Sequence, residues 1–468
     1  MNLFLYDTQA RGKKLVAPHD GHTIRMYTCG PTIYDFAHIG NFRTYVFEDL
    51  LRRTLQFFGF SVQQAMNLTD IDDKTIRGAI AKQVPLKEYV EPYRKAFFED
   101  LQALSIQPVE FYPAATDYIP DMIEMIQKLM EKGIAYRSEQ GSIYFSIRAF
   151  PSYGKLSHLP SEQLKVNASG SNEADEYEKD NVADFVLWKQ YDPARDGKIF
   201  WESPFGPGRP GWHIECSAMA MKLLGATIDI HCGGVDNMFP HHENEIAQSE
   251  CCSGSKFVHH WVHVEHLLVD HKKMSKSLGN FYTLRDLIAK GYTGSEIRYL
   301  LLSTHYRTQL NFTFAGLDAA RASLQRVEDF ILRLRSVTGF ALTTRLVEES
   351  QERFKQALAD DMNISAALAT LFDLIREANS FIDQQKLGSI EAGQILEMLQ
   401  QWDQVLAVLP LQAGLEEVPS FLLDLLKQRE NARLEKNWRL SDELRDQIHL
   451  HGFVIEDTPA GARLKRKS

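Results

Sequence analysis

The chain has 468 residues, of which 44% are hydrophobic and 24% are charged, so roughly two to four domains are expected. Its net charge of −10 argues against a protein coated in basic patches, although local clusters of lysine and arginine can still bind RNA. Five cysteines, an odd number, do not form a disulfide framework. No stretch approaches the ~20 apolar residues of a membrane span, and no signal peptide is apparent. We therefore expect a cytoplasmic protein without a membrane partner.

The first part of the chain alternates strand and helix patterns. Residues 23–29 alternate apolar and polar side chains and meet a Gly-Pro pair, which predicts a strand ending in a turn. Residues 41–58 repeat apolar side chains at helical spacing, and 61–69 have the pattern of the next strand. This β-α-β unit predicts a parallel sheet with a site at its carboxyl edge, where Cys29 and Thr69 both fall.

Residues 117–205 interrupt this pattern and predict an insertion. A helix pattern at 121–132 leads to short strand-like runs and then to a polar, acidic stretch at 167–181, which predicts a loop. Strand patterns resume at 226–231 and 257–269. A nucleotide-binding fold split by an insertion follows from this order.

The last part of the chain is mainly helical. Over residues 317–409, apolar side chains keep helical spacing with few glycines, which predicts a helix bundle. A charged helix near 420–450 and a strand-like run at 452–455 follow. The predicted fold class is therefore α/β, with a split Rossmann nucleotide-binding fold, an all-α helical bundle and a small C-terminal domain.

Residues 273–277, Lys-Met-Ser-Lys-Ser, are the most informative stretch of the chain. Two ammonium groups in a polar loop can neutralise phosphate oxygens, and such a loop can close around a reaction. Taken alone, a cluster of lysine and serine is more often a solvated turn. Residues 38–41, His-Ile-Gly-Asn, open the first predicted helix and supply the second half of a possible phosphate site.

Four residues could bind one metal ion. His241 and Glu245 are four positions apart on a predicted helix and share a face, as two ligands of one ion must. Cys29 and Cys216 would add two thiolates, and all three ligand types are acceptable to zinc. Taken singly, such cysteines are as often inert and buried, and a His-x-x-x-Glu pair is as often a surface ion pair. The other three cysteines are rival thiols.

The sequence resembles class I aminoacyl-tRNA synthetases, in which His-Ile-Gly-His and Lys-Met-Ser-Lys-Ser elements hold ATP; Asn41 replaces the second histidine. Within that class it resembles the cysteinyl-tRNA synthetase family, and the resemblance covers nearly the whole chain. The blocks that carry it are 29–32, 67–74, 185–189, 208–219, 239–245 and 360–363.

This resemblance implies an enzyme that uses ATP, with Mg²⁺, to activate L-cysteine as cysteinyl-adenylate and then charges the 3′-terminal adenosine of tRNA(Cys). The positions assigned to catalysis are His38, Lys273 and Lys276. Those assigned to ATP binding are His38, Gly40, Asn41 and Lys276. Those assigned to the amino-acid pocket are Thr69, Trp212, His231 and Asp236.

The resemblance also implies one zinc ion, with its four ligands at Cys29, Cys216, His241 and Glu245. Cysteine and serine differ by one atom, and an apolar pocket rejects a near isostere by only ~10²-fold or less. Zinc binds a thiolate at about 2.3 Å, whereas a serine hydroxyl is a harder and far less acidic ligand. Zinc would therefore select the thiol without an editing domain. Cys232 stands where the family commonly has glycine.

The end of the chain resembles the anticodon-reading domain of the family. There the positions of Arg433, Trp438, Asp442 and Asp457 meet the bases of the anticodon. The chemistry fits, because loop bases can be splayed out, stacked on aromatic or arginine planes and read at their edges. The alternative is a solvated charged helix with Trp438 buried as an anchor.

The sequence leaves two other functions open. One is the cysteine ligase of mycothiol synthesis, which shares the fold, zinc site and adenylation but lacks an anticodon-binding end. The other is a catalytically inactive, synthetase-like RNA-binding protein. Because monomers are common in the family, a monomer is expected. The expected units are 1–116 and 206–270 (Rossmann halves), 117–205 (insertion), 271–316 (lysine loop and stem-contact region), 317–409 (bundle) and 410–468 (anticodon-binding domain).

Overall fold

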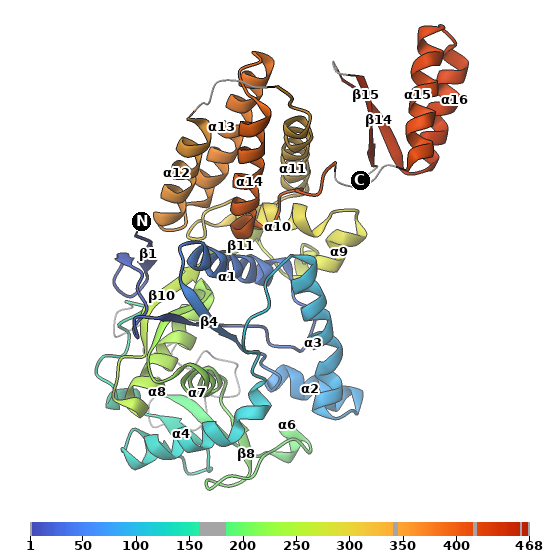
Figure 1. The fold of residues 1–468 in the computed structure, drawn as a ribbon. Helices are drawn as coiled ribbons and strands as arrows, with labels where there is room; N and C mark the ends of the chain where they lie inside the picture. Colours follow the sequence, from blue (N-terminus) through green and yellow to red (C-terminus); the bar gives the residue numbers. More distant parts are fainter. Residues whose placement is uncertain (1, 159–183, 340–344, 415–418, 459–460, 467–468) are drawn as a thin grey trace.

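A four-stranded parallel sheet in the order β10-β9-β3-β4 forms the centre of the catalytic half of the chain (Figure 1). Its strands are β3 (Thr23–Thr28), β4 (Ser61–Met66), β9 (Ile228–Gly234) and β10 (Val258–Val264). The computed structural model describes residues 2–158, 184–339, 345–414, 419–458 and 461–466, so the predicted loop at 167–181 lies outside it. The predicted strand at 257–269 is in fact two strands, β10 and β11 (Leu267–Val269).

Helices cover both faces of this sheet, because neighbouring side chains of each strand point to opposite faces. Met26 joins the hydrophobic core under α1 (Ile39–Phe57), whereas Tyr27 joins the core under α7 (Trp212–Leu224) and α8 (Glu243–Ser253). The chain leaves β3 through α1 to reach β4 on one side, and β9 lies on the other. The strand order therefore reverses between β3 and β9, which is where doubly wound folds bind nucleotides.

The insertion forms an antiparallel sheet in the order β5-β6-β7-β8. Its elements are α4 (Ile119–Glu131), β5 (Ala135–Arg137), β6 (Ile143–Phe145), β7 (Phe185–Gln190), α6 (Pro193–Asp196) and β8 (Gly208–Pro210). Asp73, at the start of α2 (Asp73–Lys82), forms ion pairs with Lys189 on β7 and Arg209 on β8. Three sequence blocks singled out above thus meet in one ion-pair network, which ties the insertion to the Rossmann domain.

A helix bundle follows the catalytic half (Figure 1). The connecting elements are α9 (Leu284–Ala289), α10 (Gly294–Leu302), β12 (Lys272–Lys273) and β13 (Leu310–Phe312), and the bundle comprises α11 (Phe314–Arg335), α12 (Leu346–Ala359), α13 (Ile364–Asp383) and α14 (Ser389–Leu406). Arg298 on α10 is buried and donates to Leu406 O (2.8 Å) and to Asp49 Oδ2 (2.5 Å). One buried guanidinium therefore joins α1, α10 and the end of the bundle. Helix α3 (Leu86–Ala103) and the hairpin β1 (Phe4–Asp7) and β2 (Gly12–Leu15) complete the catalytic half.

The C-terminal part is a helical hairpin with a β-hairpin, drawn apart from the catalytic sheet in Figure 1. Its elements are α15 (Ser420–Leu434), α16 (Trp438–Leu450), β14 (Phe453–Thr458) and β15 (Gly461–Arg466). The prediction of one helix near 420–450 is wrong. Lys436 adopts a left-handed conformation (φ 58°) and the Asn437 side chain caps α16, so the chain turns there. Among the described residues, no helix is both long and apolar enough to cross a membrane.

Glu48 on α1 is fully buried, with 0% of its surface exposed. Burial raises the pKa of this carboxyl well above its usual range, and the Thr28 hydroxyl opposes the shift only in part. In the unfolded chain a glutamate ionises near pH 4.3. As the pH rises, Glu48 therefore ionises in the unfolded chain before it ionises in the folded protein. Between the two pKa values this ionisation favours the unfolded chain, so the free energy of unfolding falls with rising pH.

Glu48→Gln should remove this cost. Relative to the wild type, the variant should gain apparent stability between pH 5 and pH 7, by up to about 1.4 kcal/mol per pH unit. Unfolding midpoints in urea at the two pH values measure the gain. Glu88→Gln, at an exposed position on α3, serves as the control and should show no such trend. A Glu48→Gln effect that is the same at both pH values would contradict the assignment.

Candidate functional site

The amino terminus of α1 lies beyond the carboxyl end of β3 and is capped by its own motif. His38 Nδ1 accepts a hydrogen bond from Asn41 N (3.2 Å), and Asn41 Oδ1 accepts one from His38 N (3.1 Å). This reciprocal capping box gives Asn41 a structural role that the sequence did not predict. Burial lowers the pKa of His38, so its ring is neutral at pH 7. A neutral donor at a helix amino terminus suits a phosphate group.

The segment that contains the lysine loop packs against this helix terminus. A Cβ atom on Gly40 would lie 3.1 Å from Met274 Cε and 3.0 Å from His38 Nδ1, so a larger residue here would crowd both side chains. Ile39 N donates to Tyr282 O (3.0 Å). The Phe281 ring packs edge-on against His38, with 5.2 Å between ring centroids. The two motifs, far apart in the sequence, are therefore neighbours.

Both lysines of the loop are accessible to solvent. Lys276 Nζ lies 2.5 Å from Asp35 Oδ2 and 5.1 Å from the centroid of Phe281, and 65% of its side chain is exposed. The hydrogen bond to Asp35 raises the pKa of Lys276. Lys273 is exposed on β12, which pairs with β11. Exposed ion pairs are weak, so Lys276 can leave Asp35 for a stronger anion.

A cluster of side chains that could bind a metal ion lies on the α7–α8 side of the sheet. One set has its four donor atoms within 4.8 Å of one another and consists of Cys29, Cys216, His241 and Glu245. A second set meets the same criterion and consists of Cys29, His231, His242 and Glu245. All six residues are buried. The ligands that the sequence suggested are therefore brought together, although His241 lies in the helical turn Met238–His242 just before α8.

The charges in this cluster are not balanced by protein partners alone. Glu245 Oε2 lies 2.9 Å from His231 Nε2, whereas Oε1 lies 3.1 Å from His241 Nε2 but accepts no hydrogen bond. Burial raises the pKa of Glu245 and lowers that of His241. The neighbouring Cys216 and burial raise the pKa of Cys29. Two thiols, an imidazole and a carboxylate with an orphaned oxygen fit the donor set of Zn²⁺.

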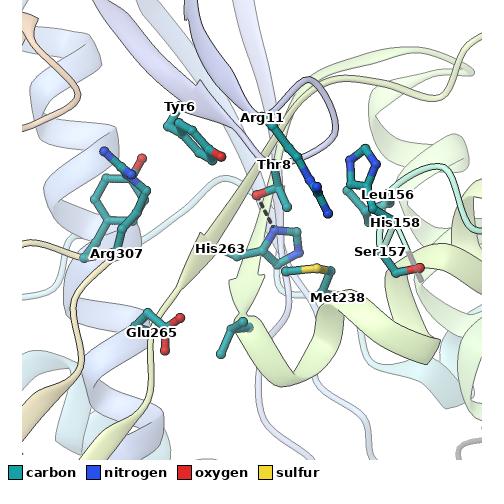
Figure 2. Close-up of a pocket in the computed structure, with 12 residues that line it drawn as sticks. Tyr6, Thr8, Arg11, Leu156, Ser157, His158, Met238, His263, Glu265 and Arg307 are labelled. Carbon is teal, nitrogen blue, oxygen red and sulfur yellow. Dashed lines mark hydrogen bonds between the residues drawn. The ribbon is translucent and has the colours of Figure 1, made fainter. Parts of the chain in front are cut away.

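Two further histidines connect Cys29 to the other side of the site. His242 Nε2 lies 3.3 Å from Cys29 Sγ, and His242 Nδ1 lies 2.8 Å from His263 Nε2. His263 Nδ1 lies 2.8 Å from Thr8 Oγ1, the contact drawn in Figure 2. If the Thr8 hydroxyl donates to His263, each ring donates onward and His242 donates to Cys29. In that arrangement His242 donates a hydrogen bond to the candidate ligand Cys29 and is not itself a metal ligand. This favours the donor set Cys29, Cys216, His241 and Glu245.

Neither His242 nor His263 was predicted as a functional residue. His242 follows His241 directly in the sequence, so the Pro-His-His run was the available signal. His263 carries no local signal, because its contact with His242 depends on the packing of β10 beside α8.

The predicted pocket residues divide between two places. Trp212 stacks on His241, with 4.2 Å between ring centroids, while 41% of its surface remains exposed. His231 contacts Glu245, and Thr69 donates to Glu215 (3.1 Å) behind the cluster. Asp236 lies instead in the turn after β9, close enough to His38 for its charge to oppose the lowering of the His38 pKa.

The predicted tRNA-binding residues lie in the C-terminal part. Trp438 opens α16 with 61% of its surface exposed, so the alternative in which it is a buried anchor is wrong. Asp442, also on α16, pairs with Arg445 (3.1 Å). Arg433 lies in the last turn of α15. Asp457 lies on β14, and its side chain is outside the described part. An exposed indole beside charged groups suits contact with bases.

Comparisons with known proteins agree along the chain. Residues 15–322 match the family described as the tRNA synthetases class I (C) catalytic domain. Residues 353–410 match the DALR domain, and 416–463 match the cysteinyl-tRNA ligase anticodon binding domain. The chain is 60% identical to the cysteine–tRNA ligase of Protochlamydia amoebophila over 99% of this chain and 98% of the relative. It is 55% identical to that of Chlamydia pneumoniae, with the same shares covered.

Solved structures share the fold at low identity. Mycobacterium tuberculosis methionyl-tRNA synthetase in complex with methionyl-adenylate superposes with a TM-score of 0.59 at 13% identity, covering 83% of this chain and 88% of that one. The Agrobacterium radiobacter LeuRS in a ternary complex gives 0.58 at 12% identity, covering 84% and 87%. The predicted class I synthetase fold is thus confirmed. The chain belongs to the cysteine–tRNA ligase family of class I tRNA synthetases.

Proposed function

We propose that this chain is a cysteine–tRNA ligase. It activates L-cysteine with ATP, releasing pyrophosphate, and transfers the cysteinyl group to the 3′-terminal adenosine of tRNA(Cys). The observation that carries the proposal is the buried set Cys29, Cys216, His241 and Glu245, placed next to the strand end from which the capped helix α1 begins. A thiol-binding site and a phosphate-binding site are what cysteine activation requires side by side.

The start of α1 and the lysine loop bind the phosphates of ATP. The neutral His38 ring and the positive end of α1 hold the phosphates of ATP, with Gly40 and Asn41 forming the helix turn. Lys276 exchanges its exposed contact with Asp35 for the phosphate charge that builds up in the transition state, and Lys273 assists. The protein forms no covalent bond to the substrates in this step. Its task is to align the carboxylate of L-cysteine with the α-phosphorus of ATP. Mg²⁺ accompanies ATP.

The cysteine side falls to the α7–α8 cluster, where Cys29, Cys216, His241 and Glu245 would hold one Zn²⁺. When bound, zinc supplies a Lewis-acid position that accepts the substrate as a thiolate and gains little from a serine hydroxyl. His242 orients Cys29 through the Thr8–His263 chain. Trp212, which stacks on His241, forms a wall of the pocket, and Asp236 is assigned to the substrate ammonium on the basis of family resemblance.

The two other functions are disfavoured. The match of residues 416–463 to an anticodon binding domain weighs against a cysteine ligase of mycothiol synthesis. The presence of His38, Lys273, Lys276 and all four candidate zinc ligands weighs against an inactive RNA-binding protein. We further propose that Arg433, Trp438, Asp442 and Asp457 read the anticodon, that the enzyme is a cytoplasmic monomer, and that the six units expected from the sequence are its domains.

The choice between the two donor sets can be tested with single variants. Cys216→Ala should lose its zinc, because Cys216 belongs to the proposed set alone. His242→Gln should keep zinc with an affinity lower by about 10–100-fold, as expected for a group that orients a ligand. Metal analysis of the purified proteins and competition with a chelator give both values. The reverse pattern would assign the ion to the set that contains His231 and His242.

Lys276→Ala tests the role of the lysine loop. Cysteine-dependent ATP–pyrophosphate exchange should lose roughly 10²–10³-fold in kcat, because a preorganised charge is removed from the transition state. The KM for cysteine should change little. Lys272→Ala removes a neighbouring exposed lysine and should leave the exchange rate unchanged. A normal kcat with a large rise in the KM for cysteine would show that Lys276 binds the amino acid instead.

Removal of the C-terminal part tests its role in tRNA recognition. Its apolar contacts centre on Leu422, Leu426 and Ile448 within the part itself, so truncation after Gly414 should leave the bundle intact. The truncated enzyme should exchange pyrophosphate normally but charge tRNA poorly. In the full chain, Trp438→Ala should lower kcat/KM for tRNA. The loss should correspond to about 1–3 kcal/mol of binding free energy in the transition state, the range for one stacked base. Charging by the truncated enzyme at the rate of the full chain would exclude anticodon reading by this part.

A further inference from the structure

Two histidines from distant parts of the sequence face each other at the amino end of β10. His19 lies between β2 and β3, and His259 is the second residue of β10. The proposed cysteine site lies toward the other end of this strand, where His263 leads through His242 to Cys29. His259 and His263 are roughly 13 Å apart along an extended strand. The pair of histidines therefore belongs to neither of the two sites described above.

The ring nitrogens of this pair are close enough to share one metal ion. His259 Nε2 lies 3.1 Å from His19 Nδ1, and the ring centroids are 4.9 Å apart with 31° between the ring planes. Zinc binds imidazole nitrogens at about 2.0–2.1 Å, so two of them on a tetrahedral ion stand about 3.3 Å apart. His19 is exposed and His259 is half-buried. An ion from solvent can therefore reach both nitrogens after a small shift of the rings.

The backbone around each histidine is fixed by the neighbouring strand. Asp229, the buried second residue of β9, accepts hydrogen bonds from His19 N (2.6 Å) and Arg25 N (2.7 Å). His259 lies between two residues of β10 that pair with β9, and its carbonyl accepts a hydrogen bond from Lys14 Nζ (2.7 Å). Little conformational freedom of the backbone is left to lose when a ligand binds, which favours binding.

The charges around the pair do not exclude a cation. Asp229 and Lys256 both act on the His259 ring, and their charges are opposite in sign. The ammonium group of Lys14 is paired with Asp7 (3.0 Å). Histidine is mainly neutral above about pH 6.5, and neutral imidazole is a common ligand of zinc, copper and nickel. Magnesium and calcium prefer oxygen ligands, so the pair suits a transition metal.

We propose that His19 and His259 bind one divalent transition-metal ion, of the class of Zn²⁺ and Ni²⁺, at a site separate from the Cys29 cluster. Among the described residues, no third histidine, cysteine or carboxylate donor joins the pair within 4.8 Å. Water completes the coordination, and the ion binds less tightly than in the four-donor cluster. The inference does not depend on the proposed function. The alternative is a hydrogen bond between the two rings that needs no ion.

Nickel binding to the zinc-loaded enzyme is the test. The full-length protein is saturated with Zn²⁺, freed of loosely bound metal by gel filtration, and titrated with Ni²⁺ in a calorimeter at pH 7.5. The wild type should bind one Ni²⁺ ion. In His19→Ala and in His259→Ala the affinity should fall by at least the roughly 10–100-fold that loss of a group supporting a ligand costs. His19 is exposed, so its removal should not disturb the core.

His449→Ala, which removes an exposed histidine on α16, is the matched control and should bind Ni²⁺ like the wild type. X-ray absorption at the nickel edge should show nitrogen and oxygen ligands, two of them imidazoles, and no sulfur. A wild type that binds no Ni²⁺ would overturn the proposal. Unchanged binding in either His19→Ala or His259→Ala, or a sulfur ligand at the nickel edge, would place the ion elsewhere and would also overturn it.

Discussion

The site depends on the burial of four donor groups beside the end of one parallel strand. Cys29 follows β3, Cys216 lies in α7, His241 lies in the helical turn just before α8, and Glu245 lies in the first turn of α8. A buried carboxylate without a full set of partners is costly. Thus the packing of α7 and α8 on the sheet must stabilise this arrangement, and a divalent cation would remove most of the cost. If the cluster binds a metal ion, as proposed, that binding would be coupled to the folding of this face.

The two chemistries of the site are separated by the same sheet. The register between β3 and β9 pairs Thr28, the last residue of β3, with Cys232, and β9 continues beyond this pair to Gly234. From that edge α1 begins on one face with a positive helix terminus, and the thiol-binding cluster lies on the other face. Under the proposed function, this arrangement would put the phosphate-binding and sulfur-binding groups close together but on opposite faces of the sheet. The lysine loop approaches the amino terminus of α1 through Met274, whose Cε atom would lie 3.1 Å from a Cβ atom on Gly40.

Local patterns predicted the parts of this architecture that depend on neighbouring residues. Strand alternation identified β3 and β4, and helical spacing placed His241 and Glu245 on one face. The His-Ile-Gly-Asn and Lys-Met-Ser-Lys-Ser motifs, which family resemblance assigns to ATP, lie next to each other in the structure. Long-range contacts were not accessible in this way. The hydrogen-bond chain Thr8–His263–His242 joins segments hundreds of residues apart in the sequence. Asp361 does the same, because it accepts hydrogen bonds from Tyr6 N and Arg307 Nε. The turn at Lys436, which splits the predicted C-terminal helix, depends on a left-handed residue that is not glycine.

The central claim is that a metal held by this cluster selects cysteine through its sulfur. X-ray absorption at the zinc edge, with and without L-cysteine, tests it most directly. The account predicts two sulfur ligands from Cys29 and Cys216 in the resting enzyme, and a third sulfur at about 2.3 Å when L-cysteine is added, with no change on addition of L-serine. A sulfur count that stays at two with saturating L-cysteine would contradict the account.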